Sequence, residues 1–232
     1  MTIRLFLFDL DGTLMLSGGA GMRAIEKVFQ DFYDLPDAFE GIVPDGKIDP
    51  AIFREIIDRR GLDSSDEDEA VQKLTLQYIE ALKKEMPVSP DAMLMPGIPE
   101  LLERLDGSPD VLLGLVTGNI EQGAYIKLAR FDLNRFFPFG AFGSDHEDRA
   151  ELVRIAVRRA EQHAGRPISM GKNVFVIGDT PRDVQCGIEN GTSTVGVAWA
   201  NFTVEQLRRA GADYVFEDFG DVERVAAELL GD

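Results

Sequence analysis

The sequence predicts an α/β protein in which a doubly wound parallel sheet carries a smaller, all-helical unit. Two observations predict the sheet. Short apolar runs typical of buried strands recur along the chain, and amphipathic helical patterns lie between them. A third observation predicts the helical unit, because one long stretch after the first strand contains helical patterns but no convincing strand.

The first expected strand, residues 4–9, reads RLFLFD and ends in a carboxylate. An apolar run without polar alternation is typical of a strand buried on both faces of a parallel sheet. Four later segments have the same character, at residues 111–117, 174–178, 194–197 and 214–216. We therefore expect these five segments to pair as one sheet.

The segments between these strands carry apolar residues at helical spacing. One stripe consists of Ile98, Leu101, Leu102 and Leu105, and a second of Leu152, Ile155, Ala156, Val157 and Ala160. Thr203 with Gln206 forms a capping-box pattern that opens a further helix. The alternation of strands and helices is typical of a doubly wound sheet.

Residues 15–93 break this alternation and are expected to form the helical unit, whereas residues 1–14 and 94–232 form the catalytic core. Asp49 followed by Pro50 is expected to be an N-cap with a first-turn proline. Residues 64–69 read SSDEDE and are expected to be a solvated loop and helix start. Three apolar stripes support this reading: Ile25, Val28, Phe29 and Phe32; Ile52, Phe53, Ile56 and Ile57; and Val71, Leu74, Tyr78 and Leu82.

Composition restricts the partners of the protein. The chain has 41 acidic and 24 basic residues and a formal net charge of −17, so its surface repels nucleic acid and anionic membranes. No apolar run has the length of a membrane span, the N-terminus lacks the features of a secretory signal, and the single Cys186 cannot form an internal disulfide. These features favour a cytoplasmic protein. A monomer or a homodimer is expected, and the sequence does not decide between the two.

The strongest chemical signal is the pair Asp9 and Asp11 at the end of the first strand, followed by Gly12 and Thr13. Side chains two residues apart on a strand point to the same face, so both carboxylates are expected at the carboxyl end of the sheet, where ligands bind in this fold. Glycine permits the sharp turn that follows. Two carboxylates in one place repel each other unless a cation neutralises them or one is protonated.

A second acidic pair, Asp179 and Asp183, follows the strand at 174–178. Three or four oxygen ligands beside open positions suit Mg²⁺, which keeps waters and binds phosphate oxygens. A third strand ends in Thr117, Gly118 and Asn119, a hydroxyl, a flexible glycine and an amide that could cradle an oxyanion. We therefore expect a magnesium and phosphate site at this edge of the sheet.

These motifs, DLDGT, then TGN, then GDTPRD, with a helical insertion after the first, resemble the haloacid dehalogenase superfamily along essentially the whole chain. The resemblance, which is phosphoglycolate phosphatase-like, implies a Rossmann-like core and a mobile helical cap. It implies that Asp9 is the nucleophile and that Asp11 is the general acid and base. It also implies Mg²⁺ bound by Asp9, the Asp11 backbone carbonyl and Asp179, with Asp183 often indirect through water, and phosphate held at Thr117 and Asn119, with Gly12, Thr13 and Gly118 in the same segments.

The sequence departs from the family pattern in one place. The family carries a lysine, sometimes an arginine, before the helix that precedes the metal-binding strand, and here that loop contains no lysine. Arg149 is the expected substitute, with Lys172 as the rival. In the cap, Arg23 and Lys47 are candidates for contact with a small phosphorylated metabolite.

Four functions compete at this stage. The first is a phosphatase, the second a phosphosugar mutase of the β-phosphoglucomutase type, and motifs barely separate the two. A haloacid dehalogenase is disfavoured, because members with that activity generally lack the second acid, here Asp11, and need no Mg²⁺. A phospho-accepting signalling module is disfavoured because such domains are about half this length and have no cap.

Overall fold

The computed structural model describes residues 2–44, 46–62, 66–199 and 201–231. A six-stranded, all-parallel sheet has the strand order β5-β4-β1-β6-β7-β8, so that β1 lies between β4 and β6. The strands are β1 (Arg4–Phe8), β4 (Val111–Thr117), β5 (Gly140–Phe142), β6 (Val174–Gly178), β7 (Ser193–Val197) and β8 (Tyr214–Phe216). The predicted Rossmann-like class is confirmed. The strand β5 is a finding that the sequence analysis did not anticipate.

Alternate side chains of β1 enter two different cores, as expected for a strand covered on both faces. Phe6 and Phe8 belong to one hydrophobic cluster, whereas Leu5 and Leu7 belong to the other, and none of the four is exposed. The first cluster includes side chains of α4 (Ile98–Asp106), α5 (Glu121–Ala129) and α9 (Val222–Leu230), and the second those of α6 (Arg149–Ala164) and α7 (Pro181–Glu189). Helix α8 (Val204–Ala210) packs on α7, β7 and β8.

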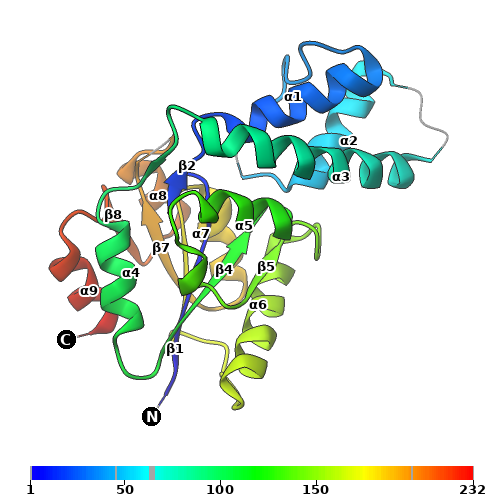
Figure 1. The fold of residues 1–232 in the computed structure, drawn as a ribbon. Coiled ribbons are helices and arrows are strands. Elements are labelled where there is room, and N and C mark those ends of the chain that lie inside the picture. The colour runs from blue at the N-terminus through cyan, green and yellow to red at the C-terminus, as the bar shows by residue number, and fades with distance from the viewer. Residues whose placement is uncertain (1, 45, 63–65, 200, 232) are drawn as a thin grey trace.

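Three further helices stand together above the carboxyl edge of the sheet (Figure 1). They are α1 (Ala20–Tyr33), α2 (Asp49–Arg60) and α3 (Glu67–Glu85), with short 3-10 helices at Met86–Val88 and, in the rest of the chain, at Asn134–Phe136. The expectation of no strand in this stretch is wrong at its ends. There β2 (Met15–Leu16) pairs antiparallel with β3 (Met93–Leu94), and two residues are too few to produce a periodic signal. The boundaries of core and cap stay a prediction.

Several local signals are confirmed. Thr203 with Gln206 forms a complete capping box, and Pro181 opens α7. The cluster at 64–69 partly lies outside the described residues, and within the described part Asp66 caps α3 by accepting a hydrogen bond from the Glu69 backbone. No helix among the described residues is long and apolar enough to cross a bilayer.

An aromatic cluster holds the three upper helices to one another. Phe53 of α2 packs edge-on against Tyr78 of α3, with ring centroids 5.7 Å apart, and its ring lies 6.4 Å from that of Phe29 in α1. All three rings are essentially buried. Apart from Phe32, which is exposed, each helix therefore buries its predicted apolar stripe against the other helices, which is how most helical segments in proteins are stabilised.

Phe53→Ala is expected to lower the free energy of unfolding by about 3–5 kcal/mol, because it removes a buried ring that three helices share. Phe32→Ala is the matched control, since Phe32 in α1 is 50% exposed and should change the same quantity by less than about 0.5 kcal/mol. Urea unfolding followed by circular dichroism measures both. Equal losses in the two variants would contradict this account of the helical packing.

Candidate active site

The first strand brings Asp9 to the carboxyl edge of the sheet, in the middle of its strand order. The Asp9 backbone N–H donates to the Ile177 carbonyl of β6 at 2.8 Å, so the residue continues the sheet, and its side chain is buried. The chain then turns at Gly12, whose φ is +83°. A Cβ atom there would lie 2.3 Å from Asp179 Oδ2, so only glycine lets the two segments approach this closely.

Three carboxylates crowd together at this edge. Asp9, Asp179 and Asp183 each present an oxygen, and these oxygens all lie within 4.8 Å of one another. Burial, reinforced by the charge of Asp183, raises the pKa of Asp9 to about 7 and that of Asp179 to about 9. Asp179 Oδ1 is buried and has no hydrogen-bond partner among the described residues. A cluster of hard oxygen donors with one unsatisfied atom fits a divalent cation such as Mg²⁺.

Asp183 has a second role in the fold. Its Oδ2 accepts hydrogen bonds from the Thr180 backbone N–H at 3.1 Å and from the Thr180 hydroxyl at 2.6 Å, which completes the capping box of α7. Thr180, rather than Asp179, is therefore the N-cap, and the Asp179 carboxylate is left to the acidic cluster.

Arg149, the first residue of α6, supplies the cation of this cluster. Its Nη2 contacts Asp183 Oδ1 and lies 3.6 Å from Asp9 Oδ1. Burial disfavours its charge, but Asp183 and Asp9 prevail and hold its pKa above the ordinary arginine value. Lys172 lies elsewhere, just before β6, where it bonds the Thr192 carbonyl and Asp213. The geometry thus brings Arg149, and not Lys172, to the acidic cluster.

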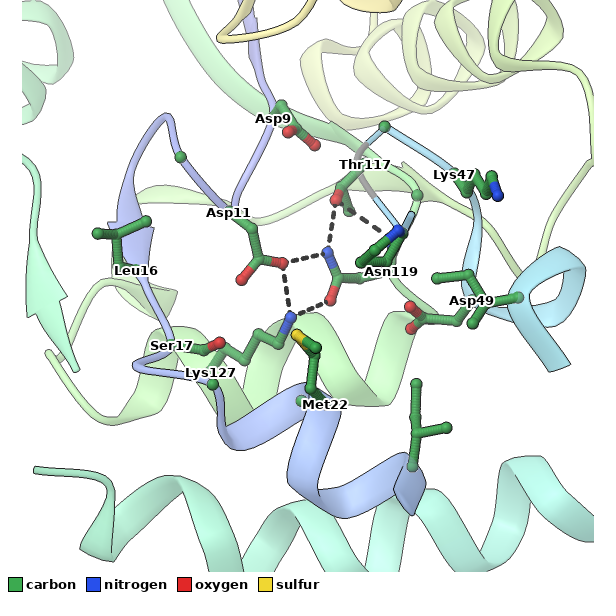
Figure 2. Close-up of a pocket in the computed structure, with 18 of the residues that line it drawn as sticks. Asp9, Asp11, Leu16, Ser17, Met22, Lys47, Asp49, Thr117, Asn119 and Lys127 are labelled. Carbon is green, nitrogen blue, oxygen red and sulfur yellow. Dashed lines mark hydrogen bonds and ion pairs between the residues drawn. The ribbon is translucent and has the colours of Figure 1, made fainter. Parts of the chain in front are cut away.

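The TGN segment forms the opposite wall, shown in Figure 2. Thr117 Oγ1 accepts hydrogen bonds from the backbone N–H of Asn119 at 3.3 Å and from its Nδ2 at 2.9 Å, and the same Nδ2 donates to Asp11 Oδ2 at 2.9 Å. These contacts fix the amide of Asn119 between the hydroxyl and the second acid of the DLDGT motif.

The sequence analysis missed Lys127, which completes this network. Its Nζ donates to Asp11 Oδ2 at 2.5 Å and to Asn119 Oδ1 at 2.6 Å, and its side chain is buried (Figure 2). Lys127 lies on the buried face of α5 with Gly123, Ala124 and Leu128. A lysine in the apolar stripe of a helix directly after TGN was a signal that could have found it.

The segment before α2 docks on the core through its backbone. The Gly46 carbonyl accepts from Arg149 and Arg182, at 3.4 and 3.1 Å. The Asp49 N–H donates to the Gly118 carbonyl at 2.9 Å, and Asp49 Oδ2 accepts from the Ile120 N–H at 3.0 Å. The predicted N-cap role of Asp49 is wrong: Ile48 occupies that position, because the Asp49 carboxylate is engaged by the core instead.

Three predicted site residues do not line the cavity. One of them, Asp183, still belongs to the acidic cluster. Thr13 is fully buried, its Oγ1 has no hydrogen-bond partner among the described residues, and it does not line the cavity. The Arg23 guanidinium donates hydrogen bonds to Glu85, the Gly18 carbonyl and Ser89. Arg23 is therefore bound by groups of the protein and does not face a ligand in the cavity. Lys47 does line the cavity, where Glu55 pairs with its ammonium group.

These walls enclose a cavity of about 430 Å³, large enough for a small metabolite. Asp9, Asp11, Thr117, Asn119, Arg149 and Asp179 line its floor, with Gly12 and Gly118. Met22, Ile25 and Ile52 from the helices above, with Phe39, line the apolar part of the rest, and Lys47 and Asp49 line it as well. Most of the chemistry-bearing groups therefore come from the core, whereas the helical unit contributes a roof that is largely apolar.

Comparison with known proteins decides the family. The model of haloacid dehalogenase-like hydrolases matches residues 6–197. The chain belongs to this family. The family is one of hydrolases, and the acidic cluster of this chain could hold a metal ion.

Relatives of the haloacid dehalogenase-like family span the whole chain. The pyrophosphatase PpaX of Oceanobacillus iheyensis is 23% identical over 98% of this chain and 99% of its own length. A predicted phosphoglycolate phosphatase from Haemophilus somnus superposes with a TM-score of 0.71 and 19% identity, over 97% of this chain and 99% of the other. A candidate β-phosphoglucomutase from Bacteroides vulgatus gives 0.68 and 22%, over 99% and 90%. At these identities the two structures demonstrate a shared fold.

Gly118→Ala should loosen the segment before α2 from the core, because a Cβ atom at 118 would lie 2.3 Å from the Lys47 carbonyl oxygen. We expect faster hydrogen exchange of backbone amides in residues 46–52, with unchanged protection in β1 and β6. Gly107→Ala, at the far end of α4, is the control and should leave both regions as they were. Unchanged exchange at 46–52 in the Gly118 variant would show that the docked arrangement tolerates a side chain there.

Proposed function

We propose that this hydrolase is a Mg²⁺-dependent phosphatase that cleaves a small phosphorylated metabolite through an aspartyl-phosphate on Asp9. The observation that carries the proposal is the convergence of Asp9, Asp179 and Asp183 within 4.8 Å, beside Arg149 and the TGN segment. Asp9, Asp179 and the Asp11 backbone carbonyl would hold the metal ion, with Asp183 acting on it directly or through water. When bound, Mg²⁺ would neutralise the acids and polarise a phosphoryl oxygen.

In the first step an Asp9 carboxylate oxygen attacks phosphorus, and the bond to the ester oxygen breaks. Asp11 gives its proton to that departing oxygen, so that an alcohol leaves. In the second step Asp11 takes a proton from water, the water oxygen attacks phosphorus, and inorganic phosphate leaves Asp9. Thr117 and Asn119 would bind phosphoryl oxygens, and Arg149 would balance the charge of the acids and of the transferring group.

The cavity and the relatives support a class of substrate. The cavity volume of about 430 Å³ suits a small ester such as phosphoglycolate or a sugar phosphate. The pyrophosphatase relative adds pyrophosphate to the candidates. A mutase is the second candidate, because a relative of the same fold is named as a β-phosphoglucomutase. Phosphate release from a panel of these esters separates the two, since a mutase returns the phosphoryl group to a sugar.

The remaining expectations for the protein, a cytoplasmic location and a monomeric or homodimeric state, stay predictions. Nucleic acid and membranes are not expected as partners.

Asp9→Asn should abolish turnover, by at least about 10³-fold, because the amide cannot form the phosphoryl-enzyme intermediate. Phosphate release with the best ester of the panel measures the loss, and thermal unfolding checks that the variant is folded. Asp58→Asn, a carboxylate-to-amide change in α2, is the control and should retain activity. Substantial turnover by the Asp9 variant would reject the proposed nucleophile.

Removal of Mg²⁺ with EDTA should abolish phosphate release, and addition of Mg²⁺ in excess should restore it. Without the cation, Asp9, Asp179 and Asp183 repel the phosphoryl dianion, and Arg149, the cation that contacts them, offsets this repulsion only in part. An enzyme that keeps full activity after exhaustive chelation would contradict the metal-dependent mechanism.

A further inference from the structure

Lys127 is unusual for a lysine on a helix, because its side chain is buried and faces the cavity. Its side chain is 6% exposed, and its ammonium group lies at the cavity wall, where it reaches two groups of the catalytic segments. Burial of an ammonium group is costly unless its charge and its N–H donors are matched. Here Asp11 Oδ2 and Asn119 Oδ1 match two of the three donors, at 2.5 and 2.6 Å.

Only one of the two Asp11 oxygens takes part in this contact. Oδ2 receives both the Lys127 ammonium and the Asn119 amide, whereas no described residue bonds Oδ1. Two donors on a single oxygen fix the orientation of a carboxylate. Rotation of the group about its Cβ–Cγ bond, in either direction, would break both contacts. Oδ1 is then the oxygen left to act on a ligand in the cavity that Asp11 lines.

The same contacts connect Asp11 to the phosphate-binding side of the cavity. Asn119 bonds Lys127 through its oxygen and Thr117 through its nitrogen, so Thr117, Asn119, Asp11 and Lys127 form one continuous network (Figure 2). The distance between the Asp11 carboxylate and the Thr117 hydroxyl is thus set by the hydrogen bonds that both make with Asn119.

We propose that Lys127 is a positioning residue that holds Asp11 with its Oδ1 facing the leaving group of the phosphate ester. The inference rests on the proposed function, since it assigns a partner to the acid of that mechanism. Lys127 acts through Asp11, and by this assignment it touches neither the phosphoryl group nor the metal ion.

The charge balance separates this role from a rival one, recognition of an anionic group on the substrate. Asp49, buried at the start of α2, lies near enough for Lys127 to oppose the rise that burial causes in its pKa. The ammonium group therefore pairs with one carboxylate, that of Asp11, and a second, that of Asp49, lowers the local positive potential from a greater distance. A cation already paired with a carboxylate attracts a further anion weakly.

The test compares two phosphate esters whose organic groups carry no charge, in the full-length enzyme with Mg²⁺. An alkyl phosphate with a neutral alcohol needs a proton as it departs, whereas p-nitrophenyl phosphate releases a stable anion and needs little help. The constant kcat/KM reports all steps up to departure of the leaving group, so it excludes the later hydrolysis of the intermediate.

Lys127→Met, which keeps the length of the side chain without donors, should lower kcat/KM at least tenfold for the alkyl ester and less than about threefold for p-nitrophenyl phosphate. Lys127→Arg keeps the charge and the donors and should recover part of the alkyl activity. Lys172→Met, which removes a lysine–aspartate pair at the other end of the sheet, is the control and should change neither constant more than twofold.

Equal losses for both esters, or no loss for either, would overturn the assignment. Failure of both Lys127 variants to fold would also overturn it, because Lys127 would then be a structural residue. A wild-type enzyme that hydrolyses no ester would reject the proposed function itself. That outcome is distinct from an active enzyme whose ester selectivity does not depend on Lys127.

Discussion

The constraint on which the structure depends is the crowding of buried carboxylates at the carboxyl edge of the sheet. Asp9, Asp179 and Asp183 place oxygens within 4.8 Å of one another in a region where water is scarce. Burial, reinforced by the like charge of Asp183, disfavours ionisation, which is why the pKa values of Asp9 and Asp179 rise so far. The surrounding chain is arranged to offset this repulsion while leaving room for a ligand.

The compensation comes from elements far apart in the sequence. Arg149 opens α6 and reaches Asp183 and Asp9, while Thr180 ties the other oxygen of Asp183 to the start of α7. Asp11, on the opposite side, receives Lys127 and Asn119. In the acidic cluster the buried Asp179 Oδ1 has no hydrogen-bond partner among the residues that the structure describes, and a divalent ion is a suitable ligand for this atom.

The sequence predicted those site residues whose positions depend only on the strands that they follow. Because β4, β1 and β6 are neighbours and parallel, the residues after their ends meet at one edge, so Asp9, Thr117 and Asp179 converge without further information. The sequence also preferred Arg149 to Lys172, since it places Lys172 just before its strand, at the opposite end, and in the structure Arg149 contacts the acidic cluster. These predictions needed only the direction of each strand.

What the sequence did not predict depends on contacts between segments. Asp49 looks like a helix cap in isolation, but a backbone N–H of the core engages its carboxylate. Arg23 looks like a free cation, but Glu85 and Ser89 bind it from more than 60 residues away along the chain. Thr13 belongs to the first motif, yet the turn at Gly12 carries its side chain into the interior. None of these partners is visible in local periodicity.

The charges around the cavity explain how so acidic a protein can accept an anionic substrate. Among the described residues, five carboxylates line the cavity, those of Asp9, Asp11, Asp49, Asp91 and Asp179, against three cations, Lys47, Lys127 and Arg149. Each of these cations already contacts a carboxylate of the protein, Glu55, Asp11 and Asp183 respectively. The side chains alone therefore offer little net attraction for a phosphoryl dianion. A cation bound at the acidic cluster would change the sign of the local electrostatic potential where the phosphoryl group must approach Asp9. The same ion would also reduce the repulsion among the carboxylates of that cluster.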